Sequence, residues 1–156
     1  GGRVKKGRPW KGGRKNNVRV SERGVKFNSY RDGREVELTP EGTVEAQKMY
    51  GGDVIIPLDE LPSYDTGRKE LEESLERTHR WEARSLNTHL ENVTSSSGNG
   101  QAMYGIIHGG VEPDLRLSSL DYITSLPFDG FAVGGSLGGN RREMVEMLKG
   151  VMEGYR

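Results

Sequence analysis

The sequence MYGIIHGG at residues 103–110 decides how this chain is expected to fold. Its first five residues form an apolar run, and a histidine and two glycines follow at once. Two other stretches have the same order, VIIPLDE at 54–60 and FAVGGS at 131–136, and a helix-like stretch follows each of the three. Strands that are buried on both faces of a parallel sheet read as continuous apolar runs, without alternation. The repeat therefore predicts an α/β protein with parallel strands and intervening helices.

The elements around these runs follow from turn, capping and periodicity signals. An N-terminal β-hairpin is expected at 25–38, because Asp32-Gly33 is a common hairpin turn, and a further β segment at 18–20 precedes it. The methionines of the last helix are expected in the core. The other strands are predicted at 53–58, 103–107 and 130–133, and the helices at 40–50, 68–90, 113–126 and 141–155.

The long helix at 68–90 carries many charges, which we interpret as a solvated face. Glu73 with Arg77, and Glu76 with Arg80, have the favourable order for ion pairs one turn apart. The interpretation assigns no function to these side chains.

The length of the chain limits the architecture. A complete barrel of eight strand–helix units needs roughly 250 residues, and this chain has 156. It offers three such units and the hairpin. Two architectures stay open, a small open α/β sheet and part of a larger protein. We favour the second, a partial (β/α)8 TIM-type barrel.

Composition excludes several kinds of site. The chain has no cysteine, so a disulfide or a thiolate zinc site cannot form within it, and we expect no metal site. No apolar run approaches the roughly 20 residues of a membrane span, and no signal-peptide pattern opens the sequence. We therefore expect a cytoplasmic protein without membrane contact.

The net charge of zero conceals an asymmetry between the N-terminus and the remainder. Residues 1–19 hold eight Lys and Arg and no acid. Residues 1–17 have no apolar period and are interpreted as a basic flexible arm, followed by a domain at 18–156. Such an arm suits contact with a phosphate backbone, and it is equally consistent with a solvated loop.

Asp59 is the foremost candidate for a binding role. It ends an apolar strand, so its carboxylate is expected to be partly desolvated and to need hydrogen-bond donors. The adjacent N–H groups of a purine-like base are such donors, because one carboxylate can accept both. The alternative is an Asp that caps the next turn or pairs with an arginine.

His108 and the glycines at 134–135 are further candidates at strand ends. The imidazole can donate, accept or titrate near neutrality, although a histidine at a strand end is often structural. Gly134 and Gly135 would let backbone amides approach a planar ligand, although a tight turn also favours glycine. No nucleophile arrangement is visible, because the chain has no cysteine, no nucleophile-elbow serine and no zinc-ligand spacing of its three histidines.

Four collinear motifs, between about residues 18 and 150, resemble those of the tRNA-guanine transglycosylases, also called queuine tRNA-ribosyltransferases. FDGFAVGG at 128–135 is similar to that family's Phe-Asp-Gly-(Tyr/Phe)-Ala-(Val/Ile)-Gly-Gly stretch. GIIHGG at 105–110, with Asp-Leu-Arg at 114–116, is similar to Gly-Ile-Val-Gln-Gly-Gly and Asp-Leu-Arg. The other two motifs are Asp59-Glu60 with Pro62, Tyr64, Arg80-Trp81 and Arg84-Ser85, and the hairpin from Gly24-Val25-Lys26-Phe27 to Leu38-Thr39-Pro40-Glu41.

The resemblance implies a (β/α)8 barrel that exchanges guanine in a tRNA anticodon for queuine or a related deazaguanine. The family uses covalent double displacement by an Asp on a nucleotide extruded from its stack. The implied partners are tRNA and a guanine- or queuine-type base, and a homodimer or heterodimer stays open. By position, Asp59 would accept hydrogen bonds from the N–H edge of the base, and the backbone at Gly134, Gly135 and Ser136 would meet its carbonyl side. His108 stands where the family usually has a base-contacting Gln.

The sequence departs from the family pattern in several places. His108 replaces the Gln, Leu61 replaces a Cys, and Ser136 replaces a common Leu. The upstream Asp-Ser-Gly-Gly-Phe-Gln motif, the nucleophilic Asp and the Cys/His zinc site of the full-length family have no match here. We therefore expect an enzyme segment that is inactive alone, with its catalytic residue unknown and no cofactor in this chain. The alternatives are a non-catalytic tRNA-binding or partner subunit, and a small open-sheet phosphate-binding domain.

Overall fold

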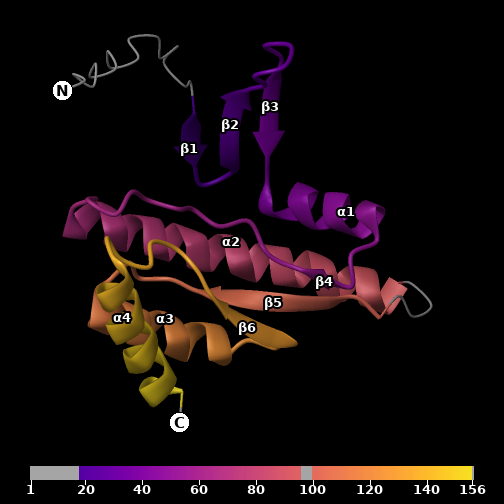
Figure 1. Ribbon diagram of the computed structural model, residues 1–156. Helices are drawn as coiled ribbons and strands as arrows, with labels where there is room; N and C mark the ends of the chain where they lie inside the picture. Colours follow the sequence, from indigo (N-terminus) through magenta and orange to yellow (C-terminus); the bar gives the residue numbers. More distant parts are fainter. Residues whose placement is uncertain (1–17, 96–99, 156) are drawn as a thin grey trace, which may run out of the picture.

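The computed structural model describes residues 18–95 and 100–155 (Figure 1). The basic arm expected at 1–17 lies outside the described residues. The described chain forms two three-stranded sheets and four helices, α1 to α4. Figure 1 shows one sheet standing apart, with α1 and α2 between it and the other sheet.

The second sheet is the parallel one that the apolar runs predicted. It has the order β4 (Val54–Ile55), β5 (Ala102–Ile107), β6 (Gly130–Val133), and both pairs of strands are parallel. Each strand leads into a helix, and both α2 and α3 pack against β5. The helices are α2 (Arg68–Ser95), α3 (Pro113–Thr124) and α4 (Arg141–Gly154), and α4 packs on α3. The parallel α/β prediction is confirmed, and the sheet is open in the described residues.

The first sheet is antiparallel and contains the predicted hairpin. Its strands are β1 (Arg19–Ser21), β2 (Gly24–Asn28) and β3 (Glu35–Leu38), in that order. The helix α1 (Pro40–Tyr50) follows, capped by the Thr39 side chain, which accepts a hydrogen bond from the N–H of Gly42. The turn between β1 and β2 is held on α2, because Trp81 Nε1 donates to the carbonyl of Glu22 over 2.9 Å.

The strand β4 is shorter than the prediction of 53–58. The ladder to β5 pairs Ile55 with Met103, and its next bond would need an N–H at residue 57. That residue is Pro57, which has no N–H to donate. Further along, the N–H of Ile106 donates to the Glu82 carboxyl over 3.2 Å, so a side chain from α2 takes the place of a strand partner.

The core lies between the parallel sheet and its helices. Gly105 in β5 permits this packing, because a Cβ there would lie 2.6 Å from atoms of Ile123 and Phe128. The expectation for the methionines of the last helix holds only in part: Met147 packs against the core, whereas Met152 is 58% exposed. The buried members of the core are Val44, Ile55, Leu86, Met103, Ile107, Leu120, Ile123, Phe128 and Val151.

Candidate base-binding site

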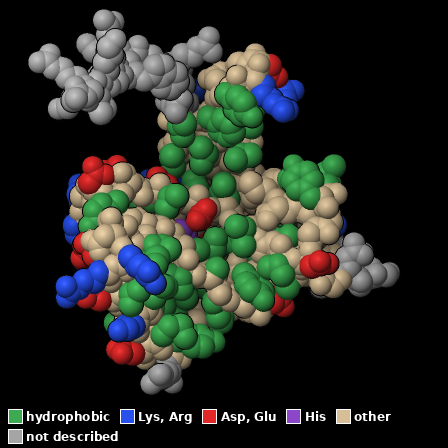
Figure 2. All heavy atoms as spheres, in the orientation of Figure 1, with side chains coloured by type: hydrophobic (Ala, Val, Ile, Leu, Met, Phe, Trp, Pro, Cys, Tyr) green, Lys and Arg blue, Asp and Glu red, His purple; other side chains and the backbone are tan. Residues whose placement is uncertain are grey.

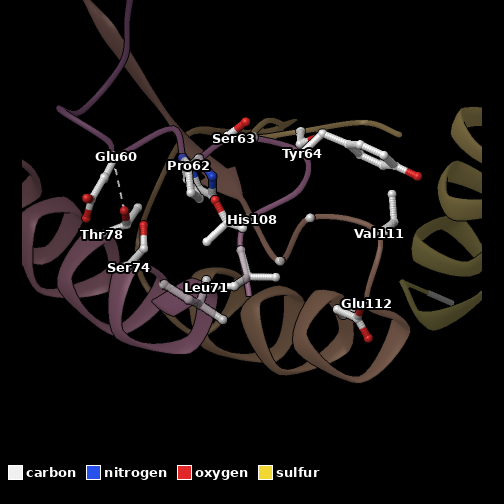
Figure 3. A pocket seen from close by; sticks show the side chains of 16 residues that line it. Glu60, Pro62, Ser63, Tyr64, Leu71, Ser74, Thr78, His108, Val111 and Glu112 are labelled. Carbon is white, nitrogen blue, oxygen red and sulfur yellow. Dashed lines mark hydrogen bonds between the residues drawn. The ribbon is translucent and has the colours of Figure 1, made fainter. Parts of the chain in front are cut away.

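The strand ends predicted to carry function meet at one edge of the parallel sheet. A small cleft lies there, between the loop after β4, the first turns of α2, and the loops after β5 and β6. Figure 3 shows Pro62, Ser63 and Tyr64 above the cleft, Leu71, Ser74 and Thr78 on α2 below it, and His108 between them. The cleft has a volume of about 40 Å³. Of the predicted site residues, His108, Gly135 and Ser136 line it.

Asp59 lies beside His108 and is not among the residues that line the cleft. Its Oδ2 is 3.2 Å from His108 Nε2. The histidine side chain is buried, whereas about a third of the Asp59 side chain is exposed. Figure 2 shows acidic and histidine atoms side by side in a hollow of this face, between hydrophobic side chains. Asp59 is therefore the part of this pair that a ligand can reach from outside.

The glycines at 134–135 also lie against the imidazole. A Cβ at Gly134 would lie 3.5 Å from His108 Cε1, and a Cβ at Gly135 would lie 3.0 Å from His108 Nδ1. Gly135 has a φ of +72°, a conformation that favours glycine. The structure thus brings Asp59, His108 and both glycines together through one ring.

Arg116 fixes the loops after β5 and β6, and it was quoted from the sequence only as part of a motif. Its buried guanidinium donates to the carbonyl groups of residues 107, 110, 134 and 136 at 2.6 to 2.9 Å. Burial lowers its pKa to about 10, so it stays charged at neutral pH. Because Arg116 holds these carbonyl groups, the peptide units of the glycine loop have a fixed orientation.

The N–H groups of the glycine loop after β6 differ in whether they donate a hydrogen bond within the protein. The Gly134 N–H donates to the carbonyl of Ile107 over 3.0 Å. Within the described part of the chain, the N–H groups of Gly135 and Ser136 donate to no protein acceptor. Two backbone donors are therefore free where Gly135 and Ser136 line the cleft.

Glu82 is a buried acid at this site that the interpretation of α2 as a solvated face missed. Its side chain is fully buried, and its Oε1 lies 3.8 Å from His108 Nε2. Burial, with a smaller contribution from the charge of Asp59, raises the pKa of Glu82 to about 9, against the opposite effect of the hydrogen bond from the Ile106 N–H. The carboxyl group is therefore protonated at neutral pH. Helical spacing could have predicted the burial of Glu82, because residue 82 falls on the same helix face as Leu75, Thr78 and Leu86.

Ion pairs and hydrogen bonds hold the loop after β4 over the cleft. Arg77 pairs with Glu60 in that loop, so the predicted Glu73–Arg77 pair is wrong, and Glu73 pairs with Lys69. The predicted Glu76–Arg80 pair is present at 4.0 Å. The Glu60 N–H donates to Thr78 Oγ1 over 3.1 Å.

The described residues offer neither a metal centre nor a membrane span. In residues 18–95 and 100–155, no group of three histidine or acidic side chains is arranged to hold a metal ion. The zinc implied for the full-length family therefore finds no fitting donor set here. None of the described helices is both long and apolar enough to cross a lipid bilayer.

Comparisons with known proteins bear on this geometry. A family model described as Queuine tRNA-ribosyltransferase matches residues 12–156. A protein of that name from Protochlamydia amoebophila is 54% identical over 131 residues, covering 84% of this chain and 33% of the relative. Its counterpart from Chlamydia muridarum is 47% identical over 131 residues, covering 84% of this chain and 34% of the relative. That from Chlamydia caviae is 44% identical over 143 residues, covering 92% and 37%.

The chain spans about a third of the length of these curated relatives. The family match, by contrast, covers nearly all of the chain and includes every candidate residue of the cleft. The motifs first noted in the sequence are thus parts of one continuous similarity. The chain belongs to the queuine tRNA-ribosyltransferase family.

Proposed function

We propose that this chain supplies the base-binding part of an enzyme that exchanges guanine in a tRNA anticodon for queuine or a related deazaguanine. The observation that carries the proposal is the arrangement around His108. A partly exposed carboxylate, Asp59, and a glycine loop with free N–H groups both lie against the ring. The name of the relatives, queuine tRNA-ribosyltransferase, agrees with this chemistry.

Each group of the site has a role in holding a guanine-type base. Asp59 accepts the two adjacent N–H groups of the base, a paired geometry that suits one carboxylate. The free N–H groups of Gly135 and Ser136 donate to its carbonyl oxygen. Gly134 and Gly135 keep side chains away from the flat ring, and His108 contacts the base where the family usually has a Gln.

The rest of the reaction needs residues that we assign to other parts of the complete enzyme. In this proposal the parallel sheet is part of a (β/α)8 barrel, and residues 18–156 are one segment of it. The nucleophilic Asp and the zinc ligands lie elsewhere, so this segment alone is inactive and its catalytic residue is unassigned. No step of the proposal uses zinc, and whether the enzyme pairs with a second subunit does not affect the binding roles above.

The nucleic-acid part of the proposal rests on charge and on the nature of the substrate. A base inside an anticodon must be extruded before it can enter a pocket. We assign the basic residues at 1–17 to contact with the tRNA phosphates, whose affinity then depends on salt. Removing them from the complete enzyme is expected to weaken tRNA binding and to flatten its salt dependence.

The cleft must widen before it can admit a base. Its volume is about 40 Å³, whereas a cavity of about 150 Å³ is known to take up benzene, a smaller ring than guanine. The wall best able to move is the loop after β4, which includes the exposed residues Leu61 and Tyr64. We propose that this loop opens for the base and closes over it.

The phosphate-binding alternative loses support from contacts in the glycine-rich loop. The Gly139 N–H donates to the Glu143 carboxylate over 2.8 Å, so a side chain already occupies the place of an anion. The N–H groups of Arg142 and Glu143, in the first turn of α4, donate to Asn140 Oδ1 at 3.0 Å. A phosphate would have to displace both acceptors.

The test is guanine exchange by the complete enzyme. The enzyme should incorporate labelled guanine into tRNA and bind free guanine in a calorimeter. Replacing Asp59 with Asn keeps the size of the side chain, removes its charge, and is expected to weaken guanine binding by about ten- to a hundredfold. The exposed residue Asp121, on α3, gives a matched control, because D121N alters a carboxylate outside the cleft and the loop after β4.

Two results would contradict the proposal. If D59N binds guanine as tightly as the unaltered enzyme, Asp59 has the capping or pairing role considered at the outset. If the complete enzyme binds tRNA but incorporates no guanine, the chain belongs to a non-catalytic tRNA-binding or partner subunit.

A further inference from the structure

Two buried polar atoms at the site have no hydrogen-bond partner, because the 3.2 Å contact of His108 with Asp59 lacks the angles of a hydrogen bond. They are Glu82 Oε1 and His108 Nε2, and among the described residues no other buried side-chain nitrogen or oxygen lacks a partner. The two atoms face each other at 3.8 Å. Leaving a buried polar atom without a hydrogen bond is costly, so two such atoms on adjacent side chains mark a place where a bond is made in another state of the site.

The charged and titratable groups around His108 come from each element that packs on it. Asp59 approaches from the loop after β4, and Glu82 approaches from α2. Arg116, on α3, lies near the ring, because a Cβ at Gly135 would be 3.0 Å from His108 Nδ1 and 3.9 Å from the Arg116 guanidinium. His79 is linked to the backbone of His108 through Ser119. The Ser119 Oγ accepts a hydrogen bond from the backbone N–H of His108 at 3.0 Å and lies 3.0 Å from His79 Nε2. Burial lowers the pKa of His79 to about 4, so it is neutral, and Arg116 is satisfied by four carbonyl groups. Only the two carboxyl groups are placed to bond the His108 Nε2.

We propose that Glu82 is a positioning residue for His108. When a base occupies Asp59, the Glu82 carboxyl group donates a hydrogen bond to His108 Nε2 and so keeps the imidazole proton on Nδ1. This inference rests on the proposed function. It identifies the hydrogen-bond edge that the site presents to the base.

The carboxyl groups of Asp59 and Glu82 differ in whether a ligand can reach them. Asp59 is partly exposed, so an incoming base can take it away from His108, whereas the fully buried Glu82 is out of reach of any ligand. Glu82 Oε2 already accepts from the N–H of Ile106, which leaves Oε1 to face the ring. Glu82 is thus the partner that remains for His108 Nε2 once the base is bound.

The protonation state of Glu82 decides the direction of the bond. At neutral pH the group carries its proton, because burial raises its pKa to about 9. A protonated carboxyl group donates, and a neutral imidazole has one donor and one acceptor nitrogen. Nε2 then accepts, and Nδ1, on the side of Gly135, carries the hydrogen.

This arrangement limits what His108 can recognise. With hydrogen on Nδ1, the ring donates to an acceptor such as a carbonyl oxygen, and it cannot accept from an amino group. A Gln at the same position can do either, because its amide can rotate. The pair of Glu82 and His108 therefore favours oxo-bases over bases with an amino group at that edge.

The experiment measures guanine binding to the complete enzyme by calorimetry at pH 7.5. Replacing Glu82 with Met keeps its bulk and removes both hydrogen bonds, and this is expected to weaken binding about tenfold. Replacing it with Gln retains a donor for Nε2 and an acceptor for the Ile106 N–H, and should restore most of the loss. On α2, the exposed Glu76 supplies the control E76Q, for which no change is expected.

A double-mutant cycle separates positioning from a general structural effect. The H108Q variant has no imidazole, so Glu82 has no ring proton to position. In that background, E82M should weaken guanine binding no further. The pH dependence gives a second readout. Affinity of the unaltered enzyme should fall as Glu82 ionises near pH 9, and that of E82Q should fall less.

Nitrogen NMR of the histidine ring tests the tautomer directly. With guanine bound at pH 7.5, the unaltered enzyme should show His108 protonated on Nδ1, and E82M should not. The inference is overturned if E82M binds guanine as well as the unaltered enzyme, if E82Q loses as much as E82M, or if E82M costs the same with H108Q. Failure of the unaltered enzyme to bind guanine would instead reject the proposed function, and this inference with it.

Discussion

Tyr64 donates from its hydroxyl group to Glu143 Oε2 over 2.9 Å, and this contact joins the loop after β4 to the first turn of α4. The same carboxylate oxygen accepts from the N–H of Gly139. A Cβ at Gly139 would lie 3.0 Å from the Tyr64 ring, so a side chain there would press on the tyrosine where the two loops meet. The contact runs from the loop after the first parallel strand to the helix after the last, and it anchors Tyr64, which lines the cleft.

Replacing Tyr64 with Phe is expected to loosen this loop without unfolding the protein. The bond is exposed, so its contribution to the free energy of unfolding is about 1 kcal/mol or less. Hydrogen exchange followed by mass spectrometry should show faster exchange at residues 61–66 in Y64F. Tyr30, which is 92% exposed, provides the control Y30F. Equal exchange in Y64F and the unaltered protein would mean that other contacts hold the loop.

Replacing Arg116 with Met should destabilise the fold, because it leaves four carbonyl groups without their donor. Each buried acceptor that loses its bond costs about 1–3 kcal/mol, and we expect a total loss of about 3 kcal/mol or more in denaturant unfolding. Lys in this position restores only part of the loss, since an ammonium lacks the planar fork of a guanidinium. R142M, on the exposed face of α4, should change stability by about 0.5 kcal/mol at most. A similar small effect of R116M would show that water replaces the guanidinium.

The sequence was informative wherever a local rule operates. The parallel strands, their order with the helices, and the hairpin followed from apolar runs and turn residues. The prediction for β4 ran past Pro57, which is a local signal for the end of a strand, and it did not include the side chain from a distant helix that takes the next strand donor. Rules for a single segment contain no information about such a partner.

The residues of the candidate site also fall into those that local sequence rules identified and those that they missed. Asp59 and His108 were found from their position after apolar runs, and the structure brings them within 3.2 Å. Glu82 and Arg116 were not singled out, because a charged residue on a helix usually faces solvent. Their burial depends on the packing of α2 and α3 against β5, which is a long-range property. A check of each charged residue against the apolar face of its helix would have identified Glu82.

Replacing Gly135 with Ala is expected to disturb the site more than the fold. The positive φ of +72° costs an alanine about 1 kcal/mol, and the new methyl group would lie 3.0 Å from His108 Nδ1 and press on the ring. Guanine affinity of the complete enzyme should fall several-fold more than stability alone explains. Gly150 is a matched control in α4, where a Cβ meets no atom within 4 Å, and G150A should stabilise the protein slightly. Unchanged guanine binding by G135A would place the base away from this loop.

The raised pKa of Glu82 predicts a pH dependence of stability. In the unfolded chain this group ionises near its ordinary value of 4.5, and in the folded protein near 9. Between these values the folded state holds one more proton than the unfolded state, so the free energy of unfolding falls as pH rises, by at most about 1.4 kcal/mol per pH unit. Below pH 4.5 the contribution of Glu82 is fully present, and above about pH 9 it is lost.

E82Q cannot titrate, so the difference in unfolding free energy between E82Q and the unaltered protein isolates this effect. Other groups, such as His79, contribute equally to both proteins and cancel. In denaturant unfolding at pH 5, 6, 7 and 8, the free energy of unfolding of E82Q relative to the unaltered protein should rise with each step in pH. A constant difference over this range would mean that Glu82 ionises normally, and that water reaches its carboxyl group in the folded protein.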